Sequence, residues 1–160
     1  MSEGEEWVLL AYRLPRVPST PRSAVWRKLR RLGVAQLGDG LVALPADART
    51  RERLEWVAEE VTDHGGEAAV WLGRPLGDAA RSAIVARMSA AVDAEYDAVV
   101  ANAAAVIPAD ETARRRAVAR LRRELHRIQD RDFFRSRRRE TARRAIDDLA
   151  AVDDTAQARA

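Results

Sequence analysis

Arginine side chains gather in one segment of the chain. Residues 114–144 contain 14 of the 28 basic residues and only four acids, so the segment has a formal charge of +10. The whole chain carries +3, which leaves −7 for everything outside the segment. Guanidinium groups form paired, charge-assisted hydrogen bonds with phosphate oxygens. A strongly positive segment on a less charged body therefore favours a polyanionic partner over a small neutral substrate.

The spacing within this segment predicts an amphipathic helix, in which each residue turns by about 100°. Four apolar residues at spacings of 3, 4 and 3 share one face: Val118, Leu121, Leu125 and Ile128. Four arginines, here named the arginine ridge, share the opposite face: Arg116, Arg120, Arg123 and Arg127. We predict that the ridge, with Arg137 and Arg144 farther along, binds nucleic-acid phosphates. The alternatives are an acidic protein partner or a solvated face in a chain whose only lysine is Lys28.

A second group of cationic and aromatic residues begins at residue 22. Arg22, Trp26 and Arg30 follow at four-residue spacing on a predicted helix, so two guanidinium groups flank the indole. Together with Arg27 they form a candidate site for an oxyanion or a protein partner, near a helix start whose backbone N–H groups favour anions. The alternative is structural, with a half-buried indole covered by arginine stems.

Residue types that are typical of catalytic centres are scarce. The chain has no cysteine, and its two histidines, His64 and His126, occupy ordinary positions on predicted helices. Residues 38–40, Gly-Asp-Gly, are too few for a phosphate-binding loop and are typical of a turn. The first predicted strand ends at residues 11–14 without an acid that could hold a divalent cation, which argues against a metal nuclease. We therefore expect no catalytic residues, no metal and no cofactor; an oxyanion reductase or a nuclease is the enzymatic alternative.

Hydrophobic periodicity and turn residues predict the elements that position these side chains. The expected elements are strands at 7–14, 34–37, 41–44 and 67–72 and helices at 21–32 and 50–64. The two middle strands enclose the Gly-Asp-Gly turn and form a hairpin. This order predicts an α+β fold with a ferredoxin-like βαββαβ sandwich. Both faces of the first strand are apolar, so either the later helices or a second subunit should cover the open face of the sheet.

The chain after Gly77 is predicted to be helical throughout. The expected helices are 78–107, one that starts at 110–112 after Pro108, and 136–152. Three parts are therefore expected: a ferredoxin-like domain at 1–76, a helical extension with basic helices at 77–152, and a frayed tail at 153–160. No apolar run approaches membrane length, and residues 1–6 are acidic, unlike a signal peptide, so a cytoplasmic protein is expected.

The N-terminal half also carries a recurring pattern of turn, arginine and tryptophan residues. Its members are Leu14, Pro15, Arg22, Trp26, Arg27, Leu29, Leu32, Gly33, Leu37, Asp39, Gly40, Leu44 and Pro45. This pattern, with the later Ile-Gln-Asp-Arg-Asp-Phe-Phe segment at 128–134, resembles the N-terminal domain of the chromate-resistance regulator family (ChrB) over most of the chain.

The resemblance implies a transcription regulator linked to chromate resistance that binds promoter DNA and responds to chromate or another oxyanion. A regulator of palindromic sites also favours a homodimer. The alternative is a non-enzymatic protein-interaction module, such as a partner subunit of a chromate sensor or transporter.

Overall fold

A computed structural model describes residues 6–107 and 110–157, with only the backbone for the last five of these. The chain forms two compact units, Met1–Met88 and Ser89–Ala160. The division falls within helix α3 (Asp78–Ala104). Helix α3 contains no glycine or proline, so neither residue breaks it at this division.

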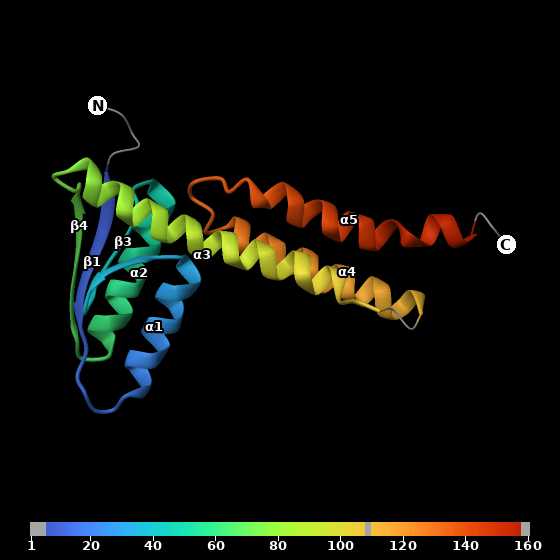
Figure 1. Cartoon of the computed structure of the whole chain (residues 1–160). Coiled ribbons are helices and arrows are strands. Elements are labelled where there is room, and N and C mark those ends of the chain that lie inside the picture. Colours follow the sequence, from blue (N-terminus) through green and yellow to red (C-terminus); the bar gives the residue numbers. More distant parts are fainter. Residues whose placement is uncertain (1–5, 108–109, 158–160) are drawn as a thin grey trace. The chain divides into compact units, whose positions relative to one another are not determined.

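The first unit contains the expected alternation of strands and helices (Figure 1). Its elements are β1 (Trp7–Arg13), α1 (Thr20–Leu32), β2 (Ala35–Gly38), β3 (Leu41–Pro45), α2 (Ala48–Asp63) and β4 (Glu67–Gly73). The strands form one antiparallel sheet in the order β2-β3-β1-β4. Helix α2 begins before the expected residue 50 because Asp47 caps it, accepting a hydrogen bond from the Thr50 N–H at 2.7 Å.

The core of this unit lies between the sheet and its two helices. Val8 pairs with Leu44 and Leu10 pairs with Val42, so these side chains share one face of the sheet, and all four are buried. Helices α1 and α2 lie together on the same side of the sheet (Figure 1). Their buried side chains complete the core: Val25, Leu29, Leu54, Val57 and Val61.

The opposite face of the sheet is covered only in part. Trp7 and Ala43 are buried there, but Trp71, which pairs with Leu9 across the sheet, is 61% exposed. Within a single chain, this face is therefore closed at Trp7 and open at Trp71. The reason is strand order: β4 is an edge strand, so fewer neighbours surround its side chains.

The second unit is built from the rest of α3, from α4 (Glu111–Gln129) and from α5 (Arg138–Gln157). Apolar side chains from all three helices form one buried cluster, which includes Val99, Leu121 and Ile146. Helix α3 ends at Ala104, before the expected residue 107, and the break expected at Pro108 lies outside the described residues.

The last helix is longer than the sequence pattern indicates. It runs to Gln157 instead of ending at Val152, because neither glycine nor proline follows to stop it. Residues 158–160 of the expected tail lie outside the described residues. Within the described part of the chain, no helix is both long enough and apolar enough to cross a membrane.

Candidate nucleic-acid interface

The arginine ridge lies on the exposed face of α4. Asp110 caps this helix by accepting a hydrogen bond from the Ala113 N–H at 2.7 Å. The four apolar residues predicted to face the core are all buried, and the four ridge arginines are all exposed. The predicted division of the helix into two faces is confirmed, and burial of the apolar face fixes the direction of the ridge.

The four ridge arginines are unpaired within the part of the chain that the structure describes. Among the residues that the structure describes, none of the four makes a hydrogen bond or an ion pair through its guanidinium group. Their neighbours do: Arg115 pairs with Glu111, and Arg122 lies 3.8 Å from Asp147. The four ridge arginines therefore carry positive charge that no carboxylate among the described residues balances.

The two other predicted contacts differ from each other. Arg137 is exposed in the turn before α5. Arg144 donates from Nε to Glu140 at 3.1 Å, and Arg143 donates to the same carboxylate at 2.6 Å. Hydrogen bonds from Arg143, and then from Arg144, lower the pKa of Glu140 to about 2. Arg144 thus adds less net positive charge to the surface than the sequence indicates.

Polar contacts hold the connection between α4 and α5 against α3. Three pairs do this: Tyr96 with Asp132, Arg131 with Glu95, and Arg138 with Asp97. The Tyr96 hydroxyl donates to Asp132 at 3.0 Å, and Asp132 also accepts from the Ser136 N–H at 3.0 Å. Burial, and then this hydrogen bond, raise the pKa of Tyr96. Sequence reasoning missed these contacts; the one available signal was the run of acids at 93, 95 and 97 on α3.

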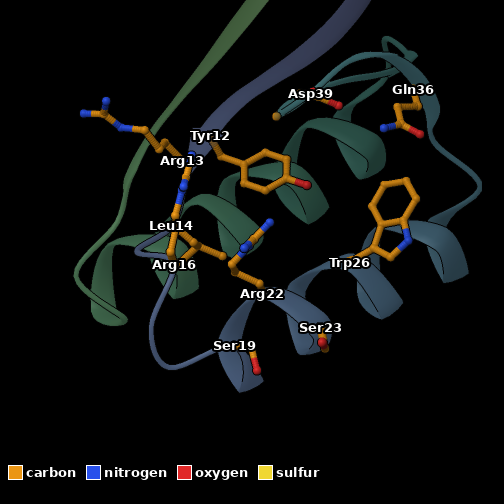
Figure 2. A pocket seen from close by; sticks show the side chains of 11 residues that line it. Tyr12, Arg13, Leu14, Arg16, Ser19, Arg22, Ser23, Trp26, Gln36 and Asp39 are labelled. Atoms are coloured by element: carbon orange, nitrogen blue, oxygen red, sulfur yellow. The ribbon is translucent and has the colours of Figure 1, made fainter.

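The first unit contains an open pocket of about 790 Å³ between the end of β1, the start of α1 and the β2–β3 turn (Figure 2). Its lining residues are Tyr12, Arg13, Leu14, Arg16, Ser19, Arg22, Ser23, Trp26, Gln36, Asp39 and Gly40. Gly40 has φ +71°, and a Cβ there would lie 2.3 Å from the Tyr12 carbonyl oxygen. Glycine therefore allows the turn to approach β1 closely enough to form one wall of the pocket.

The pocket brings together half of the residues predicted to bind an oxyanion or a partner. Arg22 and Trp26 line it, whereas Arg27 and Arg30 are exposed elsewhere on α1 and do not line it. Trp26 is half-buried. Ser19 is the N-cap of α1, but its side chain makes no capping hydrogen bond.

Tyr12 and Arg16 are pocket residues that no sequence motif indicated. Burial raises the pKa of Tyr12, and the nearby positive charge of Arg22 opposes that rise. In the described part of the chain, no group of three or more His, Asp or Glu side chains is placed to hold a metal ion.

The geometry thus defines a mixed α/β protein with a basic helical surface. A family model described as "Protein ChrB, N-terminal" matches residues 22–158. The chain therefore belongs to the ChrB N-terminal family, as the sequence motif predicted, and is a chromate-resistance-related protein. No curated protein and no solved structure gives a significant match.

Proposed function

We propose that this chain is a DNA-binding transcription regulator linked to chromate resistance, which holds DNA phosphates through the arginine ridge of α4. The observation that carries the proposal is the row of four exposed guanidinium groups without a partner among the described residues. Family membership supplies the link to chromate resistance. The proposal includes no catalytic step and no cofactor, and it places the protein in the cytoplasm.

The dimensions of the ridge suit a nucleic-acid backbone. From Arg116 to Arg127 an α-helix rises roughly 16 Å. DNA carries one phosphate for about every 3.4 Å of axis on each strand, so the ridge is long enough to reach several phosphates. Each contact would release condensed counterions, which makes such binding strong at low salt. Arg137 would extend this contact toward α5, and Arg144 would join it by exchanging Glu140 for a phosphate, because exposed ion pairs are weak.

We also propose that the first unit belongs to the ferredoxin-like class and serves as a scaffold. Its βαββαβ element order and its strand order, β2-β3-β1-β4, support that assignment.

The test is fluorescence anisotropy with a labelled duplex from the region upstream of the protein's own gene. Replacing the four ridge arginines by glutamine should weaken binding by about tenfold or more, because four phosphate contacts are lost. A control variant carries the same charge change on other exposed arginines: Arg51, Arg74, Arg81 and Arg87. We expect the control variant to bind within about threefold of the wild type. Equal losses in the two variants would reduce the effect to net charge and refute the ridge as the contact.

A protein-interaction module remains the second candidate function, and a specific observation favours it. Trp56 is 60% exposed on α2 and Trp71 is 61% exposed on β4, and exposed tryptophans are typical anchors of protein interfaces. In this case an acidic partner, such as a sensor or transporter subunit, would occupy the ridge. Anisotropy that shows no DNA binding by the wild type at low salt would favour this alternative. Sedimentation equilibrium of the purified chain would test the proposed homodimer separately.

A further inference from the structure

The pocket of the first unit has two chemically different ends, which Figure 2 shows side by side. The cationic end consists of Arg16, Ser19 and Arg22, from the loop after β1 and the first turn of α1. The aromatic end consists of Trp26, Gln36 and Asp39, from the next turn of α1, from β2 and from the β2–β3 turn. Tyr12 lies between them on β1.

The cationic end is suited to a phosphate group. Arg22 is exposed and points toward Tyr12 across the pocket (Figure 2), and no carboxylate among the described residues pairs with Arg16 or Arg22. Arg13 differs, because it turns away from the pocket and pairs with Glu67 at 2.8 Å. Two guanidinium groups and the hydroxyl of Ser19 thus provide several hydrogen-bond donors for an anion.

The aromatic end is suited to a flat, polar ring. Trp26 is half-buried and lines the pocket, so part of its indole is accessible from the pocket. An indole face stacks on any nucleobase, and a glutamine amide such as that of Gln36 both donates and accepts hydrogen bonds at a base edge. The carboxylate of Asp39 can accept hydrogen bonds from sugar hydroxyls and disfavours a second phosphate at this end.

The pocket is larger than a simple oxyanion. Its volume of about 790 Å³ lies in the range of sites for ligands of drug size. A tetrahedral anion would occupy the cationic end and leave the aromatic end empty. We propose that this pocket binds a nucleoside monophosphate, with the phosphate between Arg16 and Arg22 and the base stacked on Trp26. The ligand is a free nucleotide or the phosphorylated end of a nucleic-acid strand. This inference does not depend on DNA binding by the arginine ridge.

Isothermal titration calorimetry of the full chain tests the two ends together. The probes are AMP, GMP, CMP and UMP, with adenosine and inorganic phosphate as the halves of one ligand. Monophosphates should bind, and adenosine and phosphate alone should each bind about tenfold or more weakly, since each lacks one set of contacts. No heat from any monophosphate at millimolar concentration would overturn the proposal. Phosphate or chromate binding as tightly as AMP would also overturn it.

A 5′-phosphorylated dinucleotide distinguishes the two sources of the ligand. Tighter binding of the dinucleotide than of AMP would assign the pocket to a strand end. Equal or tighter binding of AMP would assign it to a free nucleotide. Either result supports the proposed nucleotide site.

Variants separate the cationic end from the aromatic end. Arg22→Gln should lower AMP affinity about tenfold and leave adenosine unchanged, because it removes only a phosphate contact. Trp26→Leu should lower the affinity for both ligands about tenfold by removing the stacking surface. The matched controls are Arg27→Gln on the same helix and Trp56→Leu on α2, neither of which lines the pocket.

The control variants also define the results that would refute the proposed site. Equal losses from Arg22→Gln and Arg27→Gln would show a general charge effect and no site. If circular dichroism shows that Trp26→Leu is unfolded, Trp26→Phe replaces it and should retain binding, because it keeps an aromatic face. Loss of AMP binding in a folded Trp26→Phe variant, with binding retained in Arg27→Gln, would refute stacking on an aromatic face at this position.

Discussion

Arg116 and Arg144 lie in one basic segment, yet their surroundings give them different chemistry. Arg144 has Glu140 four residues before it on α5 and donates to it. Arg116 has no acid three or four residues away on α4, and it is exposed without an ion pair among the described residues. The difference between these two arginines follows from an acid at helical spacing, which Arg144 has and Arg116 lacks.

The titration of Glu140 tests this local pairing. Its pKa is lowered to about 2, first by the hydrogen bond from Arg143 and then by that from Arg144. Arg143→Gln should move the pKa back toward 4.5, measured by NMR of the side-chain carboxyl carbon. Because the folded pKa is lowered, the stabilisation is present above pH 4.5 and is lost as the pH falls through about 2. A wild-type midpoint near 4.5 would show that the two arginines do not hold this carboxylate in solution.

At the scale of the element, local chemistry predicts most of the fold. The order of strands and helices follows from period-2 and period-3.6 patterns with glycine and proline between them. The sequence could have predicted the cap of α2, because Asp47 stands three residues before Thr50, but the helix was expected to start later. The exposure of Trp71 could not be predicted from the sequence, because it depends on which strand lies at the edge of the sheet.

The two candidate sites also differ in whether local sequence or tertiary structure brings their residues together. The arginine ridge is a repeat within one helix, so periodicity alone identifies its face. The pocket combines side chains from β1, α1 and the β2–β3 turn, and Tyr12 meets Arg22 only after the chain has folded back. Arg22 and Trp26 were predicted because they are neighbours on one helix, whereas the pocket residues on other elements were missed.

Gly40 provides a test of the turn that closes the pocket. Gly40→Ala should lower the free energy of unfolding by about 1–3 kcal/mol, because the new Cβ meets the Tyr12 carbonyl and φ is +71°. Gly38→Ala is the matched control, since a Cβ there meets nothing within 4 Å. Urea denaturation followed by circular dichroism measures both. Similar midpoints for the two variants would contradict the close approach of this turn to β1.

The connection between α4 and α5 can be tested at Tyr96. Tyr96→Phe should lower the free energy of unfolding by about 1–2 kcal/mol, because Asp132 loses a buried donor. Tyr12→Phe is the control, since no hydrogen bond of its hydroxyl is found in the described residues.

The pH dependence gives a second readout of the same contact. The pKa of Tyr96 is raised, so its stabilisation is complete below the ordinary value of 10.0 and is lost as the pH rises through the higher folded pKa. The stability difference between wild type and Tyr96→Phe should therefore shrink at strongly alkaline pH. Equal stability of the two proteins at neutral pH would contradict a supporting role for this hydrogen bond.

At the scale of the whole molecule, charge is distributed unevenly along the chain. The segment at 114–144 carries +10, and the remainder carries −7. The family match covers residues 22–158, so it includes most of the sheet unit and the whole ridge. A molecule with this distribution should associate with a polyanion through the segment at 114–144.

The salt dependence of DNA binding tests the proposed role of the ridge most directly. The logarithm of the binding constant should fall linearly with the logarithm of the salt concentration, and the slope counts the phosphates that are neutralised. Replacing the four ridge arginines by glutamine should make that slope shallower by about 3–4, because each lost contact removes about 0.9. Identical slopes for the wild type and this variant would show that the ridge does not contact DNA.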